Sequence, residues 1–350
     1  MTTLPISVRP RVAIVATGGT IAGAAASASE SLRYQSGALP VESLLSAVPS
    51  AHALADLEAE QLAAIDSKDA DNAFWCALSS NVSRLLARDE VSGVVITHGT
   101  DTLEETAYWM HLTVRSEKPV VFTAAMRPAT ALSADGPANL YDAISLAASR
   151  SARGKGVLLA FCNRIHGARD VVKVSGHALD AFASPGFGPL GSVQDGRVTF
   201  QRQAVGRYDD MPFDLPQSPA VDFARPEGWE PEQLARVGIV VSHAGVTGAV
   251  VRALRAEGVQ GIVVAGTGNG SVHASLVSAL REAIEDGVAV VRSSRTGDCR
   301  VYDDGDRRGE GGGFVPAGTL NPYKARVLLM LALSSGIRSP DALREVFSAY

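Results

Sequence analysis

The chain has 350 residues, with 32 lysines and arginines against 37 aspartates and glutamates, which gives a formal charge of −5 at pH 7. This balance argues against a nucleic-acid-binding protein, because phosphate binding needs clustered and uncompensated cations. With 46% hydrophobic and 20% charged residues, the chain can bury a substantial core, and its length predicts one large domain or two.

The sequence also argues against a membrane or secreted protein. No apolar run approaches the roughly 18 residues that a membrane helix needs, and no hydrophobic signal core precedes the first predicted strand. The cysteines lie far apart, without the C-x-x-C spacing of zinc sites and redox pairs, at Cys76, Cys162 and Cys299. The seven histidines show no metal-binding spacing either. We therefore expect a cytoplasmic protein that makes no membrane contact and holds no metal.

Short apolar, β-branched runs alternate along the chain with polar loops and with segments of helical period. This pattern predicts an α/β fold with mainly parallel sheets. The predicted helix Ser271–Glu285 illustrates the period, because its apolar residues recur every four positions and share one face. The predicted strands are, in chain order, Val12–Ala16, Gly93–Thr97, Val120–Ala124, Gly156–Phe161, Val237–Val241, Gly261–Ala265 and Val288–Arg292.

A proline-rich stretch from Gly206 to Glu232 breaks the alternation, with neither helical nor strand period, and indicates an interdomain linker. We expect the functional residues in the loops after the strands, because ligands of open parallel sheets bind beyond the carboxyl ends of the strands.

The loop after the first strand runs from Thr17 to Gly23 and contains two adjacent glycines followed by Thr20. Adjacent glycines let main-chain N–H groups approach an anion or a carbonyl oxygen closely, but the spacing fits neither a dinucleotide fingerprint nor a P-loop. The small, polar residues that follow suit a flexible lid that presents the hydroxyl of Tyr34. Taken alone, this loop is explained equally well as a simple turn.

The loop after the second strand places Thr100 and Asp101 at a strand-to-helix elbow. Thr102 and Glu105 form an S/T-x-x-E capping box, which predicts that a helix starts here and aims free N–H groups at the loop. A hydroxyl nucleophile and a carboxylate are useful together at such a place, although Asp101 could also serve only as a second cap. We predict function for Thr100 and Asp101 and a structural role for His98.

Two further loops follow later strands. One is Ala125–Pro128, and the other, residues 167–173, ends on Lys173 after two valines. A lysine whose pKa is lowered by burial can act as a base toward a hydroxyl, whereas most lysines are solvated. The residues themselves leave both roles open for Lys173.

Two segments of the chain form a specific pair, A-T-G-G-T-I-A-G at Ala16–Gly23 and I-T-H-G-T-D-T-L-E-E-T-A at Ile96–Ala107. They resemble the two signatures of bacterial-type L-asparaginases of the type II-like asparaginase/glutaminase family. The resemblance runs in consistent order from about residue 11 to the end of the chain. Further similar segments are Ala125–Pro128, S-A-D-G-P-x-N-L-Y at Ser133–Tyr141, G-x-G-N-G at Gly266–Gly270, Val290–Arg295 and Ala317–Arg326.

This resemblance implies an amidohydrolase that converts the small molecule L-asparagine to L-aspartate and ammonia without metal or organic cofactor, with L-glutamine as a secondary substrate. It implies that Thr20 is the nucleophile, through a covalent acyl-enzyme, and that Tyr34 activates and orients it. Thr100, Asp101 and Lys173 match the second catalytic group, in which lysine and aspartate polarise the threonine and the water that it holds.

The resemblance also implies a substrate cradle built from Ser67 and from the main chain around Gly19, Gly99 and Ala125. Lys68 belongs to the same expected binding surface. It stands where secreted relatives usually carry an acceptor for the substrate's α-ammonium, and a cation there would repel that group unless it points away.

The family resemblance implies a larger N-terminal and a smaller C-terminal α/β domain, which we expect at residues 1–210 and 236–350, joined by a linker at 211–235. It further implies a homotetramer built from close dimers. The cysteine pair of the secreted enzymes has no counterpart here, which supports a cytoplasmic location.

Two alternatives remain at this point. A tRNA-linked amidotransferase subunit shares the fold but normally carries an extra domain before the first strand. A non-catalytic sensor of acidic amino acids or their amides would keep the pocket without the chemistry. Both threonines, Asp101, Lys173 and Tyr34 are present, which weighs against the sensor, because binding alone needs no nucleophile set.

Overall fold

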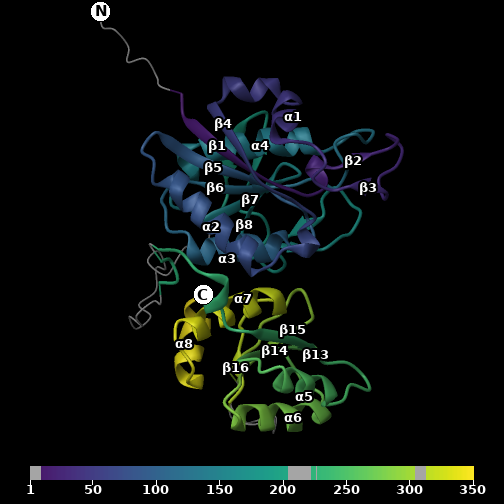
Figure 1. Cartoon of the computed structure of the whole chain (residues 1–350), viewed down its shortest axis with the longest axis vertical. Coiled ribbons are helices and arrows are strands. Elements are labelled where there is room, and N and C mark those ends of the chain that lie inside the picture. The colour runs from purple at the N-terminus through teal and green to yellow at the C-terminus, as the bar shows by residue number, and fades with distance from the viewer. Residues whose placement is uncertain (1–8, 204–221, 226, 304–312) are drawn as a thin grey trace, which may run out of the picture. The chain divides into compact units, whose positions relative to one another are not determined.

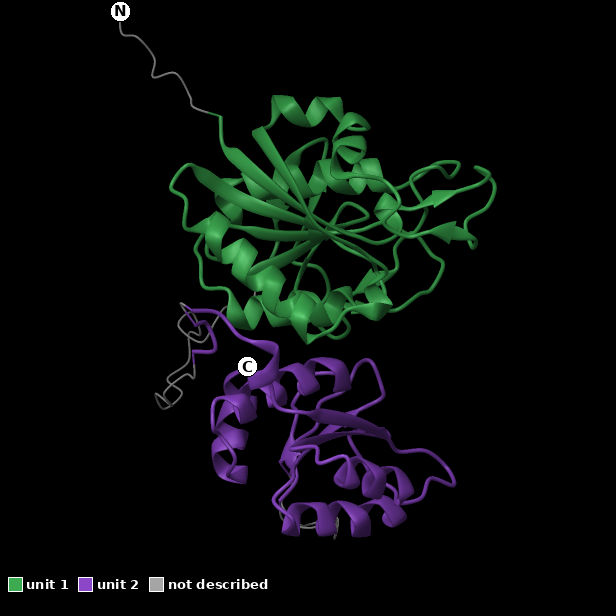
Figure 2. Cartoon of the chain, in the orientation of Figure 1, with its two compact units in different colours: residues 1–206 green, residues 207–350 purple. Residues whose placement is uncertain are grey.

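The computed structural model describes residues 9–203, 222–225, 227–303 and 313–350. The chain divides into two compact units, residues 1–206 and 207–350 (Figure 2). Each unit is an α/β structure with a mainly parallel sheet, and the N-terminal unit is the larger, which confirms the predicted fold class. None of the described helices is long and apolar enough to cross a membrane.

The N-terminal unit is built on an eight-stranded sheet of order β12-β11-β8-β7-β6-β5-β1-β4 (Figure 1). The five neighbouring strands β4, β1, β5, β6 and β7 are parallel to one another. Strands β8, β11 and β12 continue the sheet with antiparallel pairing. All four strands predicted in this part of the chain are present. The bounds are β1 Arg11–Gly18, β4 Asp56–Ile65, β5 Val91–Thr97, β6 Val120–Thr123, β7 Val157–Phe161, β8 Arg164–Gly167, β11 Gly191–Gln194 and β12 Arg197–Phe200.

Helices cover both faces of this sheet, which explains why its central strands are continuously apolar. Helices α1 (Val41–Ser46) and α4 (Gly136–Ala148) pack on one face, and α2 (Asn72–Leu86) and α3 (Leu103–Thr113) on the other (Figure 1). Two small antiparallel ladders extend beyond the sheet, β2 (Ala24–Ala25) with β3 (Tyr34–Gln35), and β9 (Val172–Lys173) with β10 (Phe182–Ala183). Short 3-10 turns are Thr20–Ala22, Pro49–Ala53, Ser67–Asp69 and Arg150–Ala152.

The C-terminal unit has a four-stranded parallel sheet of order β13-β14-β15-β16. Helices α5 and α6 pack against a core on one face, and α7 packs against β13, β14 and β15, with α8 beside α7 and β16. The three strands predicted here are present. The bounds are β13 Val237–Val241, α5 Ala249–Ala256, β14 Gly261–Gly266, α6 Ala274–Glu285, β15 Ala289–Ser294, β16 Val315–Pro316, α7 Pro322–Ser334 and α8 Pro340–Ala349.

The predicted start of helix Ser271–Glu285 is wrong by three residues. Ser271 forms an antiparallel bridge with Thr267, so the chain is still in a turn there. The helix begins at Ala274, because the ring of His273 accepts a hydrogen bond from the Ser275 N–H and caps it.

The expected linker, residues 211–235, lies outside the described residues through 221 and again at 226. In its described part, Phe223 and Trp229 are buried, and the Trp229 indole N–H donates to the Phe223 carbonyl oxygen at 2.8 Å. Phe223 also contacts the ring of Tyr350, with 5.5 Å between ring centroids. These residues therefore pack within the C-terminal unit.

Candidate active site

The two predicted catalytic loops meet because they follow neighbouring parallel strands, β1 and β5, whose carboxyl ends lie at one edge of the sheet. Gly19 and Gly99 form the contact. A Cβ atom on Gly19 would lie 2.4 Å from the Gly99 Cα atom, and Gly19 has a φ of 78°. Only glycine fits there. Thr20 and Thr100, the next residues of the two loops, are thereby brought to the same edge.

Thr20 is paired with the predicted lid tyrosine. The Thr20 hydroxyl lies 2.7 Å from the Tyr34 hydroxyl, and Thr20 is only 6% exposed. The β2–β3 ladder pairs Ala25 with Tyr34 and returns the chain to the loop. Gly23 leaves room for the aromatic ring, because a Cβ atom there would lie 2.8 Å from Tyr34 Cδ2.

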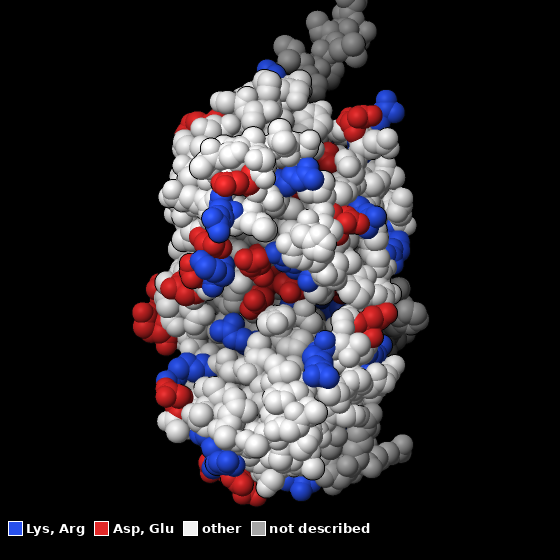
Figure 3. Space-filling model, turned by 90° about the vertical axis from the view of Figure 1, so that its right-hand side faces the viewer, with Lys and Arg blue, Asp and Glu red and all other residues white. Residues whose placement is uncertain are grey.

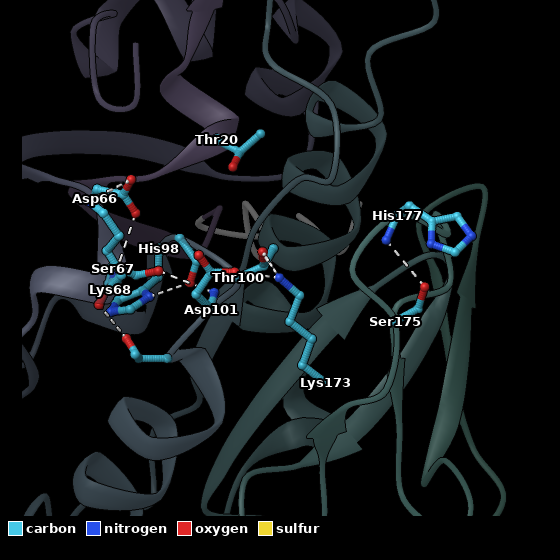
Figure 4. A network of polar contacts seen from close by, with 12 residues as sticks. Thr20, Asp66, Ser67, Lys68, His98, Thr100, Asp101, Lys173, Ser175 and His177 are labelled. Carbon is cyan, nitrogen blue, oxygen red and sulfur yellow. Dashed lines mark hydrogen bonds and ion pairs between the residues drawn. The ribbon is translucent and has the colours of Figure 1, made fainter. Parts of the chain in front are cut away.

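Lys173 connects Thr100 to Asp101 (Figure 4). Its ammonium group donates to Thr100 Oγ1 at 2.8 Å and to Asp101 Oδ1 at 2.6 Å. The lysine side chain is only 16% exposed, whereas that of Asp101 is 55% exposed. Lys173 lies in β9, opposite Phe182 of β10. Of the two roles left open for this lysine, the solvated one does not apply.

Ser67 supports the second loop from the other side (Figure 4). It is 1% exposed, and its hydroxyl oxygen accepts a hydrogen bond from the Asp101 N–H at 3.2 Å. The predicted helix start is present, since α3 begins at Leu103 with Thr102 as its N-cap. The predicted capping box is wrong, because the Thr102 hydroxyl donates to the Ser67 carbonyl oxygen at 2.7 Å and makes no cap.

Lys68 has its charge compensated locally. Its ammonium group lies 2.8 Å from the Asp69 carboxylate and 3.2 Å from that of Asp66, and the side chain is 61% exposed. Hydrogen bonds to Asp69 and then to Asp66 raise the pKa of Lys68. These carboxylates reduce the repulsion that a free cation would exert on a substrate ammonium.

His98 is enclosed, in agreement with its predicted structural role. It is 1% exposed, its Nδ1 lies 2.7 Å from the Gly99 carbonyl oxygen, and its ring lies near those of Phe74 and Phe122. Burial lowers the pKa of His98 to about 4. The ring is therefore neutral at physiological pH, with its proton on Nδ1 facing the carbonyl.

Ala125 is fully buried, and its loop is held by two side chains whose roles the sequence did not reveal. The Asp135 carboxylate accepts hydrogen bonds from the N–H groups of Met126 and Arg127, each at 2.9 Å. The Asn139 amide group donates to the Ala124 carbonyl oxygen at 3.0 Å. Both residues belong to the segment Ser133–Tyr141, whose resemblance to the family is the sequence signal that points to them.

A separate hollow of about 730 Å³ is lined by residues at the amino ends of β1, β4 and β5. The loops of Thr20 and Thr100 follow the carboxyl ends of β1 and β5, so this hollow is not part of the candidate site. Its charges are mixed, with Arg9 paired to Asp56 at 3.6 Å. Lysines and arginines are likewise interspersed with aspartates and glutamates over the face in Figure 3. Among the described residues, no group of three or more His, Cys, Asp or Glu side chains could hold a metal ion.

Both parts of the chain match known families. The profile described as "Asparaginase, N-terminal" matches residues 11–206, and that described as "Glutaminase/Asparaginase C-terminal domain" matches residues 236–347. L-asparaginase 2 of Escherichia coli is 40% identical over 342 residues, which are 97% of this chain and 93% of that protein. The glutaminase-asparaginase of Pseudomonas aeruginosa is 40% identical over 341 residues, 97% of this chain and 90% of that protein.

A solved structure agrees with these matches. The crystal structure of a probable cytoplasmic L-asparaginase from Campylobacter jejuni is similar to this chain with a TM-score of 0.87 and 42% identity, covering 98% of this chain and all of that one. These matches place the chain, with its two α/β units, among the amidohydrolases. The chain belongs to the asparaginase family.

Proposed function

We propose that this protein hydrolyses the side-chain amide of L-asparagine to L-aspartate and ammonia, with L-glutamine as a secondary substrate. Relatives named L-asparaginase and glutaminase-asparaginase support both substrates. The observation that carries the proposal is the pair of hydroxyl sites on touching loops, Thr20 with Tyr34 at 2.7 Å and Thr100 with Lys173 at 2.8 Å. A carboxamide resists water, so its hydrolysis requires an activated nucleophile, donors for the developing oxyanion and a proton for the leaving group.

In the first half of the reaction, Thr20 Oγ1 attacks the amide carbon. The O–C bond forms, the C–N bond breaks, and the hydroxyl proton passes to the departing nitrogen, which leaves as ammonia. The Tyr34 hydroxyl, in contact with Thr20 Oγ1, is placed to relay that proton and to hold the oxygen in its attacking orientation. The product of this half is an aspartyl ester of Thr20.

In the second half, water cleaves that ester. Its oxygen bonds to the acyl carbon, one proton returns to Thr20, and L-aspartate is released. We assign the polarisation of this water to Thr100, which accepts a hydrogen bond from Lys173, while Asp101 holds the lysine in place. No step of this scheme uses a metal or an organic cofactor.

The substrate cradle consists of main-chain groups around Gly19, Gly99 and Ala125 together with Ser67 and Lys68. The close contact between the backbones of Gly19 and Gly99 supports this assignment, because it holds the two loops of the cradle together, while the Gly19 N–H itself donates to the Ile65 carbonyl oxygen at 2.9 Å. The Ser67 hydroxyl orients the Asp101 N–H by accepting its hydrogen bond. The carboxylates of Asp66 and Asp69 pair with the ammonium group of Lys68 and so reduce its repulsion of a substrate cation.

The assembly and location belong to the same proposal. We expect a homotetramer built from close dimers, and domains at 1–210 and 236–350 joined by the linker 211–235. A cytoplasmic location is supported by the three free cysteines and by the name of the Campylobacter jejuni protein, whereas the Haemophilus influenzae relative, 40% identical, is named a probable periplasmic L-asparaginase.

The test is ammonia release by the purified protein with L-asparagine, L-glutamine and D-asparagine in parallel, beside the variant Thr20→Ala. Turnover of L-asparagine that is lost in the variant is the expected result. A protein that releases no ammonia, but whose melting temperature still rises with L-asparagine or L-aspartate, would be a sensor and not an enzyme.

A further inference from the structure

The directions of the Ala125 N–H and C=O groups follow from the hydrogen bonds of the adjacent residues, Ala124 and Met126. The chain contains no cis peptide bond among its described residues, and in a trans peptide the C=O and the following N–H point opposite ways. The Ala124 C=O points to Asn139, so the Ala125 N–H points away from it. The Met126 N–H points to Asp135, so the Ala125 C=O points away from that carboxylate. Both polar groups of Ala125 therefore face away from these side chains of the α4 segment.

The side that they face is that of the catalytic loop. Asn139 also accepts a hydrogen bond from the Cys162 N–H at 3.0 Å, just beyond β7, so this amide group lies between the ends of β6 and β7. On the opposite side of β6 lies β5, where His98 N–H donates to the Thr123 carbonyl oxygen at 3.0 Å. Gly99 and Thr100 follow directly. The Ala125 N–H and C=O are thus directed toward the loop of Thr100.

These two groups have no partner within the described residues, although Ala125 has no exposed surface. A buried main-chain group without a hydrogen bond is destabilising, and such groups are rare. A bound molecule with an N–H donor would satisfy the carbonyl oxygen.

The Asp135 side chain holds this loop and does not cap helix α4. Asp135 is the N-cap residue of α4, a position where aspartate usually accepts a hydrogen bond from the first turn of the helix, yet its side chain makes no cap. Each of its carboxylate oxygens instead accepts one loop N–H. Asn139 Nδ2 donates to Asp135 Oδ2 at 3.2 Å as well as to Ala124, so the two side chains act together.

We propose that Asp135 and Asn139 are positioning residues, which aim the Ala125 carbonyl oxygen at the amide nitrogen of the substrate. The inference rests on the proposed function. A fixed acceptor orients the –NH2 group that leaves as ammonia, and preorganised groups of this kind act without reorganising during the reaction. A substrate with no N–H on its leaving group gains nothing from the same carbonyl.

This difference supplies the test. L-Asparagine and the β-methyl ester of L-aspartate pass through the same acyl-enzyme, one releasing ammonia and the other methanol. We would measure kcat/KM for both by the L-aspartate formed, in the unaltered protein, Asp135→Asn and Asn139→Ala. The ratio between the two substrates does not depend on the fraction of protein that is folded, so a poorly folding variant remains informative.

The matched control is Asp142→Asn. It makes the same Asp-to-Asn change at a buried position of α4, but the Asp142 carboxylate accepts from the Asn163 side chain and makes no hydrogen bond or ion pair with a described residue of the Ala125 loop. In both positioning variants we expect kcat/KM for the amide to fall about 10- to 100-fold and that for the ester less than about 3-fold. The control should leave the ratio unchanged.

An equal loss with both substrates, or no loss with either, overturns the positioning role. Failure of the unaltered protein to release ammonia from L-asparagine is a different result, visible before any variant is made, and overturns the proposed function itself.

Discussion

Gly19 and Gly99 approach each other so closely that a Cβ atom on Gly19 would lie 2.4 Å from the Gly99 Cα atom and 2.4 Å from its nitrogen. This contact joins the loops of the two threonines. No flexible side chain is available to give way, because the neighbouring atoms are all backbone. The relative placement of Thr20 and Thr100 therefore depends on the absence of two side chains.

We predict that Gly19→Ala separates the loops. The new methyl group meets backbone atoms, and φ at residue 19 is 78°, which alanine adopts only with strain. The free energy of unfolding should fall by about 2–4 kcal/mol, with loss of nearly all activity, as measured by urea unfolding and ammonia release. Gly176→Ala is the control, because nothing lies within 4 Å of the added atom. Equal effects of the two substitutions would show that the contact is unimportant.

The catalytic role of the Tyr34 hydroxyl can be tested separately from the packing of the Tyr34 ring. Tyr34→Phe keeps the ring that packs over Gly23 and removes only the oxygen 2.7 Å from Thr20. Loss of a positioned proton relay should lower kcat about 100-fold or more, while the melting temperature stays nearly constant. An unchanged kcat would exclude Tyr34 from proton transfer.

Lys173 should matter for rate far more than for folding. Lys173→Met keeps the length of the side chain but removes the hydrogen bonds to Thr100 and Asp101. We expect kcat to fall about 1,000-fold, measured by ammonia release. Lys155→Met is the control, because the Lys155 ammonium group lies 4.7 Å from the centre of the Phe200 ring. Phe200 belongs to β12, which carries no residue of the candidate site. If Lys173→Met retained full activity, the second catalytic group would need another member.

The strands that carry the site were predictable, and the strands that complete the sheet were not. Strands β1, β5, β6 and β7 are continuously apolar because helices cover both of their faces. Strand β4, at the sheet edge, mixes acidic residues with small ones and is partly exposed along its length, so it shows no such run. The antiparallel extension through β12 consists of segments of only four residues, too short for a period to appear.

The residues of the candidate site likewise fall into those that the sequence pattern predicts and those that it does not. Gly19, Thr20 and Thr100 lie in loops whose position follows from the strands before them. Lys173, by contrast, reaches Asp101 across 72 residues of sequence, through a ladder of two residues per strand that has no periodic signal. Local patterns also mislead where tertiary contacts compete for a side chain. Thr102 has the residue type and spacing of a cap, but its hydroxyl is used to hold Ser67.

Asp142 makes stability depend on pH in a defined direction. Burial raises the pKa of Asp142 from 3.8 to about 6, more than the Asn163 side chain lowers it. In the unfolded chain this carboxyl ionises at about pH 4, whereas in the folded protein it keeps its proton up to about pH 6. The folded state thus binds more protons between these values, and this group's contribution to stability is lost as the pH rises through that window.

Asp142→Asn should remove this dependence, because asparagine carries no charge and its amide oxygen can still accept from Asn163. At about pH 7.5 the variant should be more stable by about 3 kcal/mol, and near pH 4 the two proteins should unfold at similar urea concentrations. The measurement is urea unfolding at both pH values. A gain of the same size at both values would mean that the substitution acts through packing or hydrogen bonding, because the buried charge that opposes folding is present only at the higher pH.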